Sequence, residues 1–145
     1  MRSTQTGLTT VFVCKHGRST IDACITDFED QCGFTYLDIE SDEHNFSRAI
    51  ELYYKLVQHT HEYTYQTISK TIQHDRVEHD TMPYVAALAL GVRIHLYELK
   101  PGRRGTKKHI TLDVIQEEDS KNLLDVHLLR TNRRHYGLLL PTGAI

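Results

Sequence analysis

A run of apolar segments in the last third of the chain most constrains the fold. Residues 84–97 have the pattern of a short buried helix, a glycine stop and a buried strand. Two more strand-like runs, 126–130 and 136–140, flank the polar turn 131–134. This arrangement predicts a small C-terminal sheet, and the turn sets His135 at the start of its last strand.

The rest of the chain shows mainly helical periodicity. Ser19 is the expected N-cap of a helix that begins near Thr20 and ends before Gly33. The other expected elements are a strand at 8–14, an acidic loop at 38–45, helices at about 46–59 and 63–72, a polar connection at 74–82, Pro83 as a first helical residue, and a strand at 109–115. Helices followed by a strand meander predict an α+β domain.

Composition limits the class of protein. A chain of 145 residues with 39% hydrophobic and 25% charged residues is typical of one globular domain. The net charge of −2 argues against general nucleic-acid binding and against attraction to anionic membranes. No apolar run approaches the roughly 18 residues of a membrane span. Three cysteines, an odd number without framework spacing, favour a reducing compartment, so we expect the cytoplasm.

The ordered C-terminal segments resemble the C-terminal half of ovarian-tumour (OTU) domain cysteine proteases, otubains in particular. The matching segments are an acidic stretch at 77–80, a helix end at 87–92, strands at 94–97 and 126–129, and His135-Tyr136. The match extends over residues 46–141 and is best over 77–141. It implies a single OTU-like domain over 1–145, with a helical N-terminal part packed on a small C-terminal β-sheet.

The resemblance also implies a function. OTU proteins are deubiquitinases, which hydrolyse the isopeptide bond between the ubiquitin C-terminus and a lysine. We therefore expect ubiquitin or a ubiquitin-like protein as the partner. We expect no nucleic acid, membrane, metal or cofactor, and a monomer.

A Cys/His pair is the candidate catalytic centre. Cys24 follows Asp22 near the start of a predicted helix, where the helix dipole favours a thiolate. The family places its cysteine after an Asp-Gly-Asn run at a helix start, and Asp22-Ala23-Cys24 is a shortened form of that run. On this hypothesis Cys24 attacks the carbonyl, His135 shuttles the proton and backbone amides of 22–24 hold the oxyanion.

The third catalytic group is open. The family commonly has Asp or Asn two residues after the histidine, and this chain has Gly137, which has no side chain to accept a hydrogen bond. Asn132, Asp22 or Asp125 could take its place.

Alternatives to an active deubiquitinase also stay open. On a rival alignment, residues 21–28 follow the catalytic loop, and Cys24 is a core thiol. The chain would then be a non-catalytic module that binds ubiquitin or a ubiquitin-conjugating enzyme, or its nucleophile would lie in a lost segment before Met1. A third interpretation is a viral or bacterial protease of OTU-like fold.

Three residues around His135 are candidates for substrate binding. Arg133 and Arg134 precede it and could meet acidic side chains of a partner. Tyr136 is expected to pack beside the histidine ring.

Other charged and metal-binding patterns are less informative. The ten histidines are densest at 59–62 and 74–79, but neither group has the H-E-x-x-H spacing of a helical zinc site. We expect them to be surface histidines. The basic run 100–108 is typical of a solvated hairpin loop.

Overall fold

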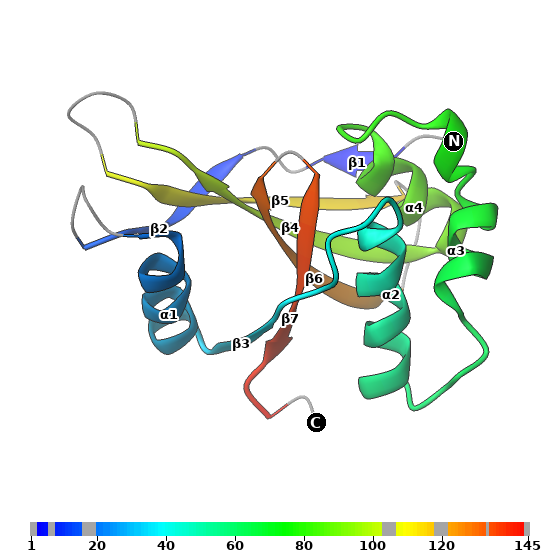
Figure 1. Ribbon diagram of the computed structural model, residues 1–145, viewed down its shortest axis with the longest axis horizontal. Helices are drawn as coiled ribbons and strands as arrows, with labels where there is room; N and C mark the ends of the chain where they lie inside the picture. Colours follow the sequence, from blue (N-terminus) through cyan, green and yellow to red (C-terminus); the bar gives the residue numbers. More distant parts are fainter. Residues whose placement is uncertain are drawn as a thin grey trace.

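The computed structural model describes residues 3–5, 8–15, 20–102, 107–117, 122–132 and 134–143. Its centre is a twisted sheet with helices packed on both faces (Figure 1). The described strands are β1 (Ser3–Gln5), β2 (Thr9–Val13), β3 (Phe34–Leu37), β4 (Val92–Lys100), β5 (His109–Glu117), β6 (Leu124–Asn132) and β7 (His135–Pro141). The described helices are α1 (Ile21–Cys32), α2 (Asn45–Leu56), α3 (Tyr65–Thr71), the 3-10 turn η1 (His74–Arg76) and α4 (Met82–Leu90).

The strand order among these residues is β1-β5-β4-β6-β7-β3, with β2 also paired to β5. The β4–β6 pair is parallel and the other pairs are antiparallel. β6 and β7 form a hairpin whose register shifts near the turn, so that His135 lies opposite Asn132. β3 pairs with the outer side of β7, and this brings the chain after β3 close to His135.

Each face of the sheet carries its own apolar cluster. On one face, β4 contributes Val92, Ile94 and Leu96 to a core shared with α2, α3 and α4. On the other face, Tyr97 and Leu99 join a smaller aromatic cluster covered by α1. Because both faces are covered, β7 is a nearly continuous apolar run, whereas β4 has polar residues between the apolar ones that it contributes to the two clusters. Burying each such side chain stabilises the fold by roughly 1.5–3 kcal/mol.

Helix ends follow local sequence signals. The Thr20 side chain accepts a hydrogen bond from the Ala23 N–H at 3.1 Å and so caps α1. The predicted cap, Ser19, lies outside the described residues. Gly33 ends α1 in the left-handed conformation, with φ of 74°, where a side chain would be strained.

The structure combines helices with a largely antiparallel sheet, which is compatible with the predicted α+β class. The division into a helical N-terminal part and a C-terminal sheet is too simple, because β1, β2 and β3 all join the sheet. The four residues of β3 were missed because such a short segment has too little periodicity to be recognised. Of the helices in the described ranges, none has the length and apolar character that crossing a bilayer requires.

Candidate functional site

The ring of His135 lies where the start of β7 meets the loop between β3 and α2. Its Nε2 atom is 2.8 Å from Oδ1 of Asp38, and its Nδ1 atom is 2.8 Å from Oγ of Ser41. An ionised carboxylate can only accept, so Nε2–H donates to Asp38 and Nδ1 of the neutral ring accepts from the Ser41 hydroxyl. Both ring nitrogens are therefore used, in one defined tautomer.

Asn45, the first residue of α2, closes the inner side of this arrangement. Its Nδ2 atom lies 3.4 Å from Nδ1 of His135 and donates to the Glu40 carbonyl at 3.0 Å. Its Oδ1 atom accepts from the Tyr136 N–H at 2.6 Å. Asn45 is only 2% exposed, and its bond from the Tyr136 N–H is made away from water. The amide thus ties α2, the preceding loop and β7 together beside the histidine.

The orienting carboxylate comes from the end of β3. The hydrogen bond from His135 lowers the pKa of Asp38 below its ordinary value, and a second bond from the Tyr36 hydroxyl at 3.2 Å acts in the same direction. The Tyr36 ring lies so close to Gly137 that a Cβ there would overlap it. Gly137 thus leaves room for the tyrosine that supports Asp38.

None of the three substitutes considered from the sequence is hydrogen-bonded to the His135 ring. Asn132 accepts from the Arg134 N–H at 3.0 Å, and Asp125 pairs with Arg93 and His95. Asp22 lines a cavity with His135, but no hydrogen bond joins the two side chains. The carboxylate beside the histidine ring is therefore Asp38, which was assigned to an acidic loop.

His135 separates two cavities. One, of about 260 Å³, is lined by Ile21, Asp22, Asp38 and other residues. The other, of about 420 Å³, lies on the Ser41 side and includes Arg134. The site is thus open to a ligand on both sides of the ring.

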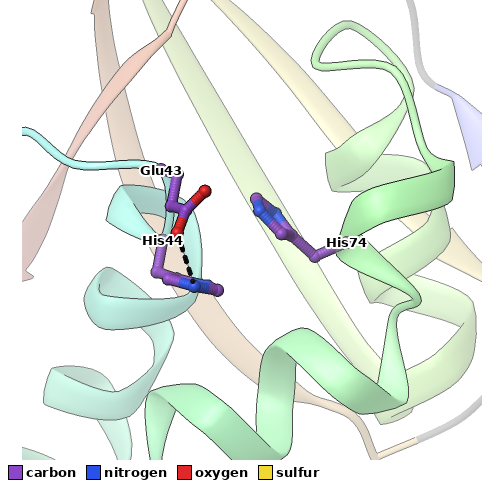
Figure 2. A group of neighbouring side chains, drawn as sticks. All are labelled: Glu43, His44 and His74. Carbon is purple, nitrogen blue, oxygen red and sulfur yellow. Dashed lines mark ion pairs between the residues drawn. The ribbon is translucent and has the colours of Figure 1, made fainter.

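A second histidine group lies at the same helix start. Figure 2 shows Glu43 and His44, just before α2, facing His74 of η1. Their ligand atoms all lie within 4.8 Å of one another, and two imidazoles with a carboxylate are a donor set that divalent metal ions bind.

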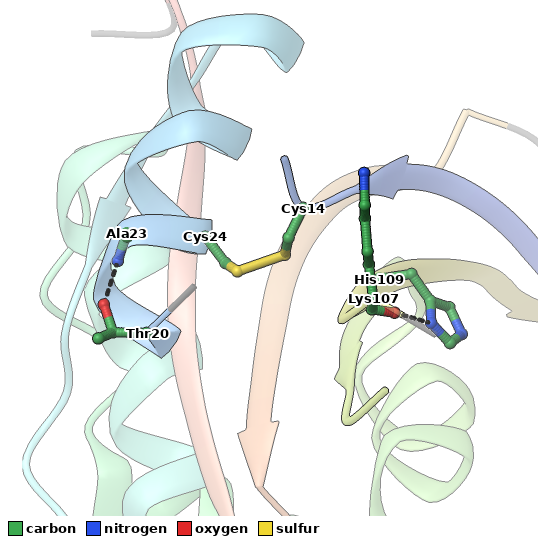
Figure 3. The surroundings of a disulfide bond; sticks show 6 residues. All are labelled: Cys14, Thr20, Ala23, Cys24, Lys107 and His109. Atoms are coloured by element: carbon green, nitrogen blue, oxygen red, sulfur yellow. Dashed lines mark hydrogen bonds between the residues drawn. A yellow bond between two sulfur atoms is a disulfide. The ribbon is translucent and has the colours of Figure 1, made fainter. Parts of the chain in front are cut away.

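The sequence-predicted nucleophile, Cys24, is bonded to another cysteine. Cys24 is fully buried and forms a disulfide with Cys14, the residue after β2, with Cα atoms 5.4 Å apart (Figure 3). It therefore has no free thiol in this structure.

The remaining cysteine is also poorly placed. Cys32 is free and its residue is exposed. Partial desolvation of the thiol nevertheless raises its pKa, which disfavours the thiolate. It is the last residue of α1, whereas Asp22, which reaches the His135 cavity, is in the first turn. Ten residues of helix separate them by about 15 Å.

The three predicted substrate-binding residues do not all lie at the His135 site. Arg134 is exposed at the cavity beside Ser41 and His135. Tyr136 is fully buried on the opposite face of β7, with its ring edge-on to Phe46 at 5.0 Å, and does not pack beside His135. Arg133 lies outside the described residues.

Three residues of the site were missed: Asp38, Ser41 and Asn45. The available signal was an acidic loop leading directly into a helix start, but nothing local ties it to a histidine some 90 residues later. No protein-family model matches the chain, and no curated protein does.

Proposed function

We propose that this protein is a non-catalytic, OTU-like module that binds ubiquitin or a ubiquitin-like protein. The observation that carries the proposal is that the helix start beside His135 presents Asn45 where a cysteine protease needs a thiol. An amide cannot act as the nucleophile in acyl transfer.

The start of α2 supports this interpretation. The OTU family places its cysteine after an Asp-Gly-Asn run at a helix start, and here Asn45 follows Asp42-Glu43-His44 at the start of α2. The histidine with an orienting carboxylate is kept, as His135 with Asp38. This alignment fits the geometry better than one through Cys24, which is buried in a disulfide.

The surface around His135 is suited to a protein ligand. Two cavities meet at the ring, and the exposed Arg134 offers a cation to a carboxylate or an acidic side chain. A ubiquitin partner implies the cytoplasm, where the Cys14–Cys24 pair would be kept reduced, and the Cys24 thiol would still be excluded as a nucleophile by its complete burial.

The test uses ubiquitin that carries a thiol-reactive group at its C-terminus. The wild-type protein should form no covalent adduct, yet Arg134 and the Ser41 side of the site should show NMR shifts with unmodified ubiquitin. An adduct that disappears in Cys24→Ala would overturn the non-catalytic assignment. Absence of both adduct and binding would remove ubiquitin from the proposal.

A gain-of-function variant makes the test sharper. Asn45→Cys puts a thiol at the helix N-terminus beside His135, where the dipole and the imidazole favour the thiolate. It should form the adduct, and Asn45→Cys combined with His135→Ala should react at least 10-fold more slowly. Ser47→Cys, at a buried position two residues further along α2, is the matched control and should stay unreactive.

One observation favours a second candidate, a serine-type hydrolase. Ser41, His135 and Asp38 form a hydrogen-bonded chain with two links of 2.8 Å, and Ser41 is exposed. In such an enzyme the serine oxygen attacks an acyl carbon while its proton passes to Nδ1 of the histidine.

A fluorophosphonate probe, which labels activated serines, separates the two candidates. Labelling of the wild type that is lost in Ser41→Ala and falls at least 1,000-fold in His135→Ala would favour the hydrolase. Unlabelled wild-type protein would exclude it and leave the binding module.

A further inference from the structure

The group formed by Glu43, His44 and His74 lies outside the His135 site and joins two segments about 30 residues apart. His44 precedes the first turn of α2, and His74 begins η1. The two imidazole rings face each other at 4.7 Å between centroids, with 34° between their planes (Figure 2). The His44 Nε2 atom is 3.5 Å from Oε1 of Glu43.

Hydrogen bonds behind His44 define which nitrogen is available. Its Nδ1 atom lies 2.9 Å from Oγ of Ser69, and the Ser69 hydroxyl donates to Oγ of Ser47 at 2.7 Å. Because Ser69 gives its single proton to Ser47, it accepts from Nδ1–H of His44. Both serines are buried, so the bond between them is protected from water, and the bond to His44 is half-buried.

This tautomer directs a lone pair toward a carboxylate. With the proton on Nδ1, Nε2 of the neutral His44 ring faces Glu43, and two acceptors 3.5 Å apart gain nothing from each other. A cation between them removes the conflict. Histidines that bind metals nearly always donate their other ring N–H to a protein acceptor, as His44 does to Ser69.

The backbone that carries these ligands is already held. Asp42 accepts from the His44 N–H at 2.9 Å and from Nε of Arg48 at 2.8 Å. The Arg48 guanidinium lies 3.8 Å from the centre of the Tyr65 ring, which in turn packs 5.4 Å from the ring of His44. Little reorganisation of α2 is therefore needed for binding.

We propose that Glu43, His44 and His74 bind a divalent transition-metal ion of the zinc type. Tetrahedral zinc with bonds of about 2.1 Å places its ligand atoms about 3.4 Å apart. The His44–Glu43 pair already has this spacing, and the rest of the group, within 4.8 Å, needs only side-chain rotation. Three protein ligands leave a fourth position for water or a ligand. The ion connects η1 to α2, contrary to the sequence-based expectation that the histidines hold no metal.

The first experiment is calorimetric titration of the protein with Zn²⁺ alone. We expect one equivalent to bind and to raise Tm, and Co²⁺ to give the visible spectrum of a tetrahedral site. Glu43→Gln, an exposed change that leaves the fold intact, should weaken binding at least 10-fold. His74→Gln should weaken it at least 100-fold.

Two further variants distinguish this site from adventitious binding. Ser69→Ala removes the bond to Nδ1 of His44 without touching a ligand, and should weaken binding about 10-fold or more. His61→Ala, an exposed histidine in the other dense group, is the matched control and should bind as the wild type does. Binding that is unchanged in Glu43→Gln and His74→Gln, or lost in His61→Ala, would overturn the proposal.

Discussion

Two histidines flank the start of α2 and use their rings in opposite ways. His135 has both nitrogens occupied by protein groups, Asp38 on one side and Ser41 on the other. His44 has one nitrogen bonded to Ser69, while the other faces Glu43. The His135 ring is saturated by the fold, and the His44 ring has a free coordination position. The same residue type therefore supports different chemistry, because its hydrogen-bond partners decide which nitrogen remains available.

Within the His135 site, the buried Asn45 is expected to contribute more to stability than the exposed Ser41. Asn45→Ala should lower the free energy of unfolding by about 3 kcal/mol, because the Tyr136 N–H and the Glu40 carbonyl lose a buried partner. Urea unfolding followed by circular dichroism measures this loss. Ser41→Ala, at an exposed position, should cost less than about 1 kcal/mol. Equal losses in the two variants would mean that the Asn45 bonds do not hold the site together.

The hydrogen bond from Tyr36 to Asp38 can be disturbed by a substitution at Gly137, which lies against the Tyr36 ring. Gly137→Ala should destabilise the fold by about 2 kcal/mol, because the new Cβ overlaps the Tyr36 ring. The double variant with Tyr36→Leu removes the overlapping ring and should recover part of the loss. Thermal denaturation of the three proteins gives the answer. A Gly137→Ala protein as stable as the wild type would show that Tyr36 moves aside freely.

In a third histidine, His127, burial has a larger effect on the pKa than the neighbouring charged groups do. Burial lowers the pKa of His127 to about 4, with a smaller contribution from His95. The ring stacks on His95 at 4.2 Å, and Asp125 opposes the shift. The unfolded chain takes up this proton near pH 6.5 and the folded chain only near pH 4, so stability is lost as the pH falls between these values.

For His127 we expect a loss of about 1–2 kcal/mol, reduced by the partial exposure of the ring. His127→Gln should lose less stability than the wild type between pH 6.5 and 4, and urea unfolding at several pH values compares them. Parallel curves for the two proteins would contradict the assignment.

The smallest expected effect concerns Asp38 itself. Its hydrogen bond with His135 is the main cause of its lowered pKa, so His135→Gln should move that pKa up toward the ordinary value. NMR titration of the Asp38 carboxyl measures the shift. His44→Gln is the control and should leave the titration unchanged, since the His44 ring contacts Ser69 and Glu43 and makes no bond to Asp38. A carboxyl that titrates alike in all three proteins would mean that the bond contributes nothing.

The sequence predicted much of the fold but little of the site. Apolar periodicity identified α2, α3 and the strands of the β6–β7 hairpin, because each pattern is complete within a few turns or residues. The turn between the two strands also placed His135 at the start of β7. Cys24 was predicted as the nucleophile from its neighbours in sequence. The structure places it in the aromatic cluster covered by α1, bonded to Cys14.

Asp38 and Ser41 lie 97 and 94 residues from His135 along the chain. They reach it because β3 pairs with the outer side of β7 and the residues after β3 pass the start of β7, where His135 lies. His44 and His74 likewise meet only when α2, α3 and η1 pack together. The sequence by itself determined the α+β class, most elements and the position of His135, since these depend on local periodicity. The tertiary structure alone decided what each histidine faces, because those contacts depend on strand pairing and helix packing between distant segments.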